Sequence, residues 1–253
     1  MVSIITPTFN SSRFIGETIE CIQRQTYQDW ELLITDDCST DETVQIVKRY
    51  AAEDPRIKLF CMEKNSGGGA SRNNSIKEAK GRYIAFCDSD DRWLPDKLET
   101  QLAFMEKTSA AFTYSSYLLC DEEGNDMGIA VCRKYISYLR ILMDNYIGCL
   151  TAMYDTEKLG KVYMPLIRKR QDWGLWISII KKCRVAYGIK KPLGIYRIRE
   201  NSVSSNKLNL IKYHVMLYKE MLHLPMFCGS LLYMFVNLPS YLFKQLRNKI
   251  INV

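Results

Sequence analysis

The stretch GRYIAFCDSDDRWLP, residues 81–95, runs a short apolar segment directly into a cluster of carboxylates. Residues 83–87 are mostly apolar, and Asp88, Asp90 and Asp91 follow at once. Like charges this close repel each other unless a cation, a hydrogen-bond donor or water relieves the repulsion. The cluster therefore indicates either a binding site at the end of a strand or a solvated acidic loop that caps the next helix.

The rest of the first 120 residues alternates between strand patterns and helix patterns. Ile15, Ile19 and Ile22 repeat at the spacing of one helix face. Strands are predicted at residues 2–6, 30–35, 57–62, 83–87 and 112–119. This alternation predicts an α/β fold with a mainly parallel sheet, helices on both faces, and ligands bound beyond the carboxyl ends of the strands.

Local signals also predict where two helices begin. Ser39 and Glu42 have the spacing of a capping box, and Pro95 is expected in the first turn of a helix that runs to Glu106. After residue 120 the alternation weakens. There the sequence predicts a hairpin turn at 121–126, helices at 135–144 and 173–182, and strands at 148–154 and 193–198.

Composition limits the chemistry. Nine cysteines form no CxxC pair, and no secretory signal precedes the first strand, so a reducing cytosolic compartment is expected. The only histidines, His214 and His223, lie late in the chain, which argues against a histidine-built zinc site and against a nucleophile activated by histidine. Any general base is therefore expected to be a carboxylate.

The net charge of +7 conceals a division between the two halves of the chain. Residues 1–132 carry 14 basic and 22 acidic side chains, whereas residues 133–253 carry 21 basic and 6 acidic ones. The first half is therefore expected to bind a cation and the second half to meet anions such as phosphates or anionic lipid. No nucleic-acid-binding signature accompanies the basic half, and no nucleic acid partner is expected.

Residues 221–243 contain no charged residue, and Lys244, Arg247 and Lys249 follow. Prolines, a glycine and an asparagine interrupt this segment, so broken helices at an anionic membrane surface are expected rather than a bilayer span. A buried terminal hairpin or an oligomer interface is the alternative.

Other nucleotide-binding classes lack their motifs here. The turn after the first strand reads TPTFNSS in place of GxGxxG, and no GxxxxGK[ST] occurs. The chain instead resembles glycosyltransferase family 2, the inverting enzymes with the GT-A fold. The segments that carry the resemblance are VSIITPTFN, TIECIQRQTYQDWELLITDDCSTDET, NSGGGASRNNSIKEAKGRYIAFCDSDDRWLPDKL and RQDWGLW, with a weaker echo in YRIRENSVSS.

The resemblance implies a metal-dependent transfer of a sugar from a nucleotide diphosphate donor. Asp90 aligns with the family's metal-binding aspartate and would hold Mg²⁺ or Mn²⁺, while Asp88 would face the donor ribose. Asp37 would accept a hydrogen bond from the nucleobase, although capping of the next helix is its alternative role. Arg72 would lie near the base and diphosphate, with a surface salt bridge as the alternative.

Further positions follow from the same resemblance. Pro7 and Phe9 match residues that wall the base pocket, although core packing is an alternative for Phe9. Asp172 matches the general base that activates the acceptor hydroxyl. Many relatives have Glu-Asp where this chain has Gln171-Asp172, which puts a second carboxylate contact to the acceptor in doubt. Three cations before it, residues 168–170, could lower its pKa or meet a phosphate on the acceptor.

One more departure concerns Arg199, which stands where relatives often have a histidine. An arginine cannot ligate a metal but can clamp phosphate, and a solvated basic loop is its alternative role. Trp173 and Trp176 fit either the core or a platform for a sugar.

The expected organisation is a GT-A domain at 1–206, with a donor half at about 1–120 and an acceptor half at about 121–206. A membrane-association segment at 207–253 would follow. The expected acceptor is a glycan or a lipid-linked intermediate of cell-surface polysaccharide, handled on the cytosolic face of the membrane. A non-catalytic sugar-nucleotide-binding protein and a sugar nucleotidyltransferase are the alternatives.

Overall fold

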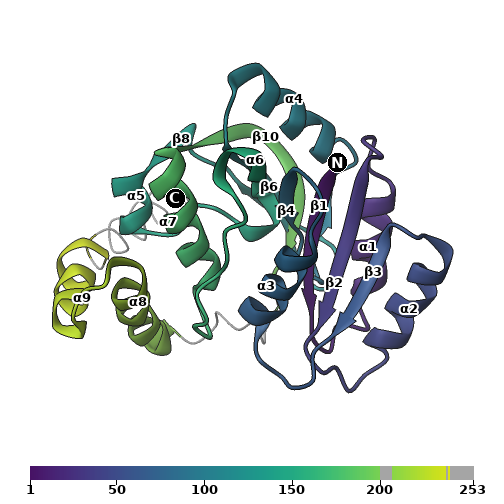
Figure 1. Cartoon of the computed structure of the whole chain (residues 1–253), viewed down its shortest axis with the longest axis horizontal. Helices are drawn as coiled ribbons and strands as arrows, with labels where there is room; N and C mark the ends of the chain where they lie inside the picture. Colours follow the sequence, from purple (N-terminus) through teal and green to yellow (C-terminus); the bar gives the residue numbers. More distant parts are fainter. Residues whose placement is uncertain (200–206, 238, 240–253) are drawn as a thin grey trace.

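In the computed structural model, which describes residues 1–199, 207–237 and 239, helices flank one ten-stranded sheet (Figure 1). The strands are β1 Val2–Thr8, β2 Trp30–Asp36, β3 Ile57–Cys61, β4 Tyr83–Phe86, β5 Arg92–Trp93, β6 Phe112–Cys120, β7 Asp126–Ala130, β8 Tyr135–Ser137, β9 Met153–Asp155 and β10 Val185–Arg197. The helices are α1 Ile15–Gln23, α2 Thr43–Glu53, α3 Gly68–Glu78, α4 Lys97–Thr108, α5 Tyr138–Met143, α6 Thr156–Leu159, α7 Gln171–Cys183, α8 Lys207–Leu222 and α9 Met226–Leu232, with a 3₁₀ turn η1 Cys149–Thr151 and a π-helical turn η2 Tyr233–Asn237.

The strand order is β3-β2-β1-β4-β9-β6-β10-β5, with β7 paired to β6 and β8 to β10. The four strands β3, β2, β1 and β4 are all parallel. Beyond them β9 is antiparallel to both of its neighbours, and β10 is parallel to β6. The predicted α/β architecture is confirmed, with a parallel first half and a mixed second half. The carboxyl ends of β1, β2 and β4 consequently meet at one edge of the sheet.

Alternating side chains along the strands create a core on each face of the sheet. In β1, Ile4 belongs to the core cluster that includes residues of α1, α2 and α4, whereas Ile5 belongs to the cluster that includes residues of α3, α5, α7 and α8. The predicted inward face of α1, formed by Ile15, Ile19 and Ile22, is completely buried. Burial of each such side chain contributes about 1.5–3 kcal/mol, which fixes α1 over the sheet.

Both predicted helix starts were wrong in detail. Helix α2 begins at Thr43, and its first N–H donates to Asp41 Oδ1 at 3.0 Å. The Ser39 side chain bonds Asp36 and the backbone N–H of Asn10, so it is not available as a cap. Helix α4 begins at Lys97, two residues after Pro95, and the Pro95 carbonyl accepts a hydrogen bond from Thr26 N instead.

Two predictions in the second half were also wrong in part. Residues 135–137 form β8, which pairs with the start of β10, and the helix predicted at 135–144 covers only 138–143. Within the strand predicted at 148–154, residues 149–151 form a 3₁₀ turn, closed by a hydrogen bond from Thr151 N to Gly148 O, and strand β9 starts at Met153. The hairpin turn at 121–126 is confirmed by the β6–β7 pairing.

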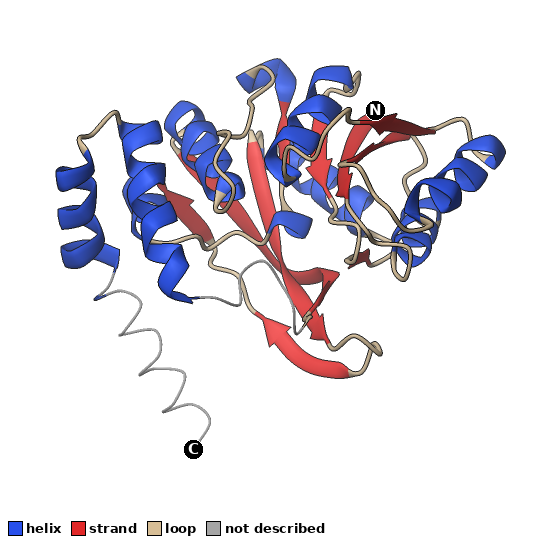
Figure 2. Ribbon diagram, turned by 90° about the horizontal axis from the view of Figure 1, so that it is seen from below, coloured by secondary structure: helices blue, strands red, loops and turns tan. Residues whose placement is uncertain are grey.

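The described part of the C-terminal segment packs on the second half of the sheet domain (Figure 2). Leu217 and Tyr218 of α8 are buried in the core, and the Tyr218 hydroxyl lies 2.6 Å from the Leu142 carbonyl. On α9 and η2, Phe227 and Phe235 are more than 70% exposed. No helix among the described residues has the length and apolar character needed to cross a bilayer. The basic residues at 244, 247 and 249 lie outside the described residues.

Candidate active site

A cavity of about 880 Å³ opens at the carboxyl edge of the parallel strands. Its walls come from the turns after β1, β2 and β4, the start of α3, the start of α7 and the end of β10. All eight residues that the sequence singled out line this one cavity: Pro7, Phe9, Asp37, Arg72, Asp88, Asp90, Asp172 and Arg199.

Asp37 holds the glycine loop that precedes α3. Its two carboxylate oxygens accept hydrogen bonds from Ser66 N at 2.8 Å and Gly67 N at 2.7 Å. Gly67 has a φ of +88°, a conformation that a glycine adopts without the steric cost of a Cβ. Asp37 therefore fixes this loop at the cavity wall, and the structure shows no capping of α2 by its side chain.

Pro7 and Phe9 differ in their surroundings. Pro7 is buried within β1, whereas the Phe9 side chain is 47% exposed and lines the cavity. Core packing is therefore not the role of Phe9, and its ring is accessible to a ligand.

Two arginines pair with carboxylates of the acidic turn after β4. Arg72, on α3, pairs with Asp88, and Arg199 Nη1 donates to Asp90 Oδ2 at 3.0 Å. Burial and the neighbouring charge of Asp88 raise the pKa of Asp90, while Arg199 opposes that shift. Burial opposes the charge on Arg72, but the Asp88 carboxylate outweighs it and raises the pKa of the guanidinium group. Two of the clustered carboxylates are thus paired with arginines, one from α3 and one from the segment after β10.

The carboxylates of Asp88 and Asp90 fit a hard divalent ion. Mg²⁺ is usually held by one or two carboxylates together with substrate phosphates and water. Within the described ranges no group of three or more His, Cys, Asp or Glu side chains could hold a metal by itself. An ion at this turn would consequently take its remaining ligands from water and a bound phosphate.

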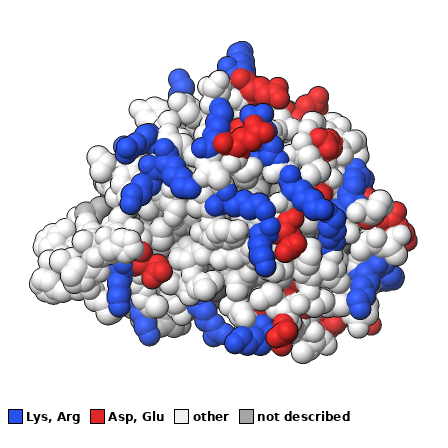
Figure 3. All heavy atoms as spheres, in the orientation of Figure 1, with Lys and Arg blue, Asp and Glu red and all other residues white. Residues whose placement is uncertain are grey.

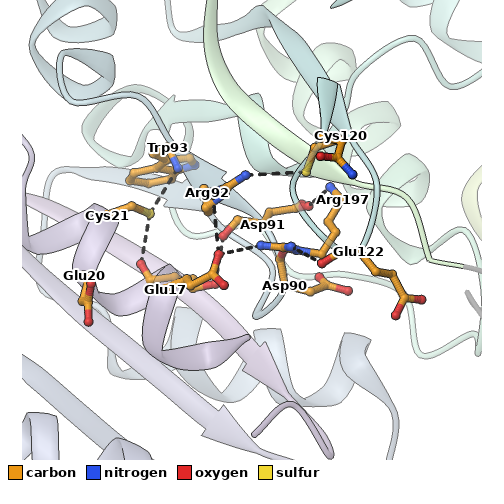
Figure 4. A network of polar contacts seen from close by, with 12 residues as sticks. Glu17, Glu20, Cys21, Asp90, Asp91, Arg92, Trp93, Cys120, Glu122 and Arg197 are labelled. Atoms are coloured by element: carbon orange, nitrogen blue, oxygen red, sulfur yellow. Dashed lines mark hydrogen bonds and ion pairs between the residues drawn. The ribbon is translucent and has the colours of Figure 1, made fainter. Parts of the chain in front are cut away.

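Arg197, at the end of β10, also bonds the acidic turn, and sequence reasoning missed this residue. Figure 4 shows its side chain between the acidic turn and α1. Its side chain is 3% exposed and donates to Asp90 O at 3.1 Å, to Glu122 O at 2.7 Å and to Glu17 Oε2 at 2.7 Å. One guanidinium group therefore joins the end of β10 to α1, to the acidic turn and to the β6–β7 hairpin.

Asp91 is the second buried member of this network. Its Oδ1 accepts a hydrogen bond from the backbone N–H of Arg197 at 3.0 Å. Burial and the charges of Asp90 and Asp88 raise its pKa well above the ordinary value. The sequence signal that could have identified Arg197 is its spacing of two residues from Arg199, which places both on one side of an extended chain.

Asp172 lies in the first turn of α7 and is half-buried. Asn145 Nδ2 donates to Asp172 Oδ2 at 2.7 Å and so orients the carboxylate. Sequence reasoning missed Asn145, because the loop after α5 meets the first turn of α7 only in the folded chain. Trp173 and Trp176 are fully buried and belong to the core, which excludes them as platforms for a sugar.

Known proteins resemble this chain in both sequence and structure. The profile described as "Glycosyl transferase family 2" matches residues 3–157. The putative teichuronic acid biosynthesis glycosyltransferase TuaG of Bacillus subtilis is 42% identical over 87% of this chain and 88% of its own length. The UDP-Glc:alpha-D-GlcNAc-diphosphoundecaprenol beta-1,3-glucosyltransferase WfgD of Escherichia coli is 38% identical over 84% and 83%. The crystal structure of S. aureus TarS in complex with UDP-GlcNAc superposes with a TM-score of 0.74 at 23% identity, covering 92% of this chain and 73% of that one.

Proposed function

The chain belongs to glycosyltransferase family 2, and from that premise we propose that it transfers a sugar from a nucleotide-diphospho-sugar to an acceptor hydroxyl with inversion at the anomeric carbon. The observation that supports this most directly is the single cavity lined by both Asp90 and Asp172. Inversion by in-line displacement needs the leaving diphosphate and the attacking hydroxyl on opposite sides of one carbon. A diphosphate at Asp90 and a hydroxyl at Asp172 would meet that requirement.

On the donor side, Asp37 would accept an N–H of the nucleobase while Pro7 and Phe9 wall the base. Asp88 would bind the ribose, and its partner Arg72 would lie toward the diphosphate. Arg199 donates to the carboxylate of Asp90. If a cation took that carboxylate, the Arg199 guanidinium group would be available to phosphate oxygens. Bidentate contacts from arginine suit this purpose because the guanidinium fork matches phosphate geometry.

A divalent ion, Mg²⁺ or Mn²⁺, would be held by Asp90. When bound, such an ion neutralises the charge that develops on the leaving diphosphate. The buried hydrogen bonds of Arg197 would keep the Asp90 backbone in place while ligands exchange. The charge repulsion between Asp88 and Asp90 supports this assignment, because a bound cation relieves it.

On the acceptor side, Asp172 would take the proton from the attacking hydroxyl. Asn145 would keep the carboxylate turned toward the cavity and would leave its second oxygen for the hydroxyl. Gln171 cannot accept a proton as a glutamate would, so one base remains at this end of α7.

We further propose that the acceptor is a lipid-linked intermediate of a cell-surface polysaccharide. WfgD is named for a diphosphoundecaprenol acceptor and TuaG for teichuronic acid biosynthesis. The domain at 1–206 would carry the chemistry, and residues 207–253 would rest on the inner face of the cell membrane. The end of the molecule formed by α9 shows almost no charged side chains in Figure 3, which suits contact with lipid.

Turnover of UDP-sugars by wild type and by Asp172→Asn tests the proposal. General-base catalysis contributes about 10²–10⁴-fold, so transfer should fall by that factor while UDP affinity stays within about twofold. Asp29→Asn is the matched control, because the exposed Asp29 side chain bonds the N-terminal amine at 2.8 Å and the Tyr27 hydroxyl at 3.4 Å and does not line the cavity. A variant at 172 that keeps most of its turnover would show that another group is the base. A wild-type chain that binds UDP-sugars without any turnover would instead identify a non-catalytic binding protein.

A further inference from the structure

The loop before α7 carries three consecutive basic residues, Arg168, Lys169 and Arg170, and all three line the cavity. Within the described part of the chain, neither Arg168 nor Arg170 forms an ion pair. The Nε atom of Arg170 is buried and has no hydrogen-bond partner among the described residues. Buried donors in proteins are usually satisfied, so this guanidinium group points to a ligand that supplies the acceptor.

The backbone at Arg170 is unusual as well. Its φ of +66° and ψ of 18° fall in the left-handed region, which residues with a Cβ rarely occupy. Such conformations occur preferentially at functional sites, where the surrounding structure maintains them. Here the left-handed residue turns the chain directly into α7, so the cationic loop and Asp172 lie at the same end of this helix.

The other arginines that line the cavity already have acidic partners. Arg72 pairs with Asp88, Arg199 with Asp90 and Arg197 with Glu17. Arg168 and Arg170 therefore contribute two positive charges that no ion pair among the described residues compensates. The two negative charges of a diphosphate diester would balance them.

The position of the cations favours the acceptor over the donor. The proposed donor contacts come from β1, α3 and the turns after β1, β2, β4 and β10, whereas Arg168 and Arg170 lie within four residues of Asp172. The same loop exposes the Leu166 side chain by 79% and Tyr163 by 46%. Apolar surface directly beside cations suits a molecule that joins a diphosphate to a hydrocarbon chain.

We propose that Arg168 and Arg170 bind the diphosphate group of a lipid-linked acceptor and thereby place the hydroxyl of its sugar at Asp172. This assignment rests on the proposed function, because it takes Asp172 as the acceptor side of the cavity. It adds a subsite for the phosphate-bearing part of the acceptor to a cavity that already provides for the donor.

The test is calorimetry with octyl diphosphate, in the presence of Mg²⁺ and of UDP or GDP, whichever the wild-type chain binds. The double variant Arg168→Gln/Arg170→Gln should bind octyl diphosphate at least about tenfold more weakly than wild type, which corresponds to about 1.4 kcal/mol. Its nucleotide affinity should remain within about twofold. Arg184→Gln is the matched control, because Arg184 is an exposed arginine with a φ of +69° at the opposite end of α7.

Several outcomes separate the possibilities. Octyl glucoside should not bind at this subsite, and Arg168→Gln alone should reproduce part of the loss if the double variant does not fold. Weakened nucleotide binding with unchanged octyl diphosphate binding would overturn the proposal, because the arginines would then serve the donor. Inorganic diphosphate binding as tightly as octyl diphosphate would overturn the assignment to a lipid-borne acceptor. Failure of the wild-type chain to bind UDP or GDP would contradict the proposed function, and octyl diphosphate binding would still report on the subsite.

Discussion

Replacing Arg197 by methionine removes the guanidinium group while keeping much of the side-chain volume. The Arg197 side chain is 3% exposed, and its donors serve the carbonyls of Asp90 and Glu122 and the carboxylate of Glu17. The Glu17 side chain is 49% exposed and regains water when the partner is lost. The two part-buried carbonyls each lose a charged donor, and a hydrogen bond from such a donor contributes about 1.5–3 kcal/mol.

We therefore expect Arg197→Met to lower the free energy of unfolding by about 3–5 kcal/mol, roughly the contribution of the two hydrogen bonds to carbonyls. For a chain of this size Tm falls by about 2–4 °C per kcal/mol, so the expected loss is about 6–20 °C. The control is Arg13→Met. Arg13 bonds the Glu122 side chain at 2.7 Å but is 58% exposed, so that variant should lose less than about 1 kcal/mol.

Thermal unfolding followed by circular dichroism measures the first effect, and calorimetry with UDP and Mn²⁺ measures a second one. Because Arg197 holds the backbone of Asp90, its removal should weaken metal-dependent UDP binding by about tenfold or more, whereas Arg13→Met should leave it unchanged. Arg197→Lys keeps the positive charge but has fewer N–H donors. Its Tm and its UDP affinity should lie between those of wild type and of Arg197→Met. If Arg197→Met unfolded within about 4 °C of wild type and bound UDP normally, the network would not position the acidic turn.

Three further expectations concern the metal, the core and the tail. Asp90→Asn should abolish the increase in UDP affinity that Mn²⁺ produces, and an increase preserved in calorimetry would exclude Asp90 as the ligand. Burial lowers the pKa of Lys97 to about 7, so the charged form is disfavoured in the folded state. Burying the charged amine destabilises the fold fully below pH 7, and this cost disappears as the pH approaches the unfolded pKa of about 10.4. In urea unfolding between pH 7 and 10, the free energy of unfolding of wild type should therefore rise relative to that of Lys97→Met by about 1.4 kcal/mol per pH unit. A difference between the two proteins that does not change with pH would contradict this. Phe227→Ser/Phe235→Ser should reduce flotation with phosphatidylglycerol vesicles, and equal flotation of this variant and of the surface control Met127→Ser would remove the support for a membrane-binding tail.

The sequence predicted the half of the fold in which neighbours in the chain are also neighbours in space. Strands β1 to β4 are short apolar runs, and the helices α1 and α2 between the first three are amphipathic, so local periodicity was sufficient to identify most of this half. Parallel strands all end at one edge, and this is why residues as distant as Pro7, Asp37 and Asp88 could be expected in one cavity.

The second half depends on contacts that no local pattern encodes. Strand β8 exists because the start of β10, some 50 residues later, offers it a partner, and its own sequence looked helical. Arg197 was missed for the same reason, since two of its acceptors are backbone carbonyls from distant loops and carry no signature in the sequence. Asn145 likewise reaches Asp172, in the first turn of α7, only in the folded chain.

The anchoring of the glycine loop by Asp37 has a consequence for which nucleotides can be accommodated. Both oxygens of this carboxylate already accept backbone N–H groups, so the group faces the cavity in a fixed orientation and only as an acceptor. Uracil, thymine and guanine each present a ring N–H at the edge that would approach it, whereas adenine and cytosine present a bare ring nitrogen there. The Asp37 carboxylate that fixes the loop would thus select between these two groups of bases, independently of which sugar the nucleotide carries.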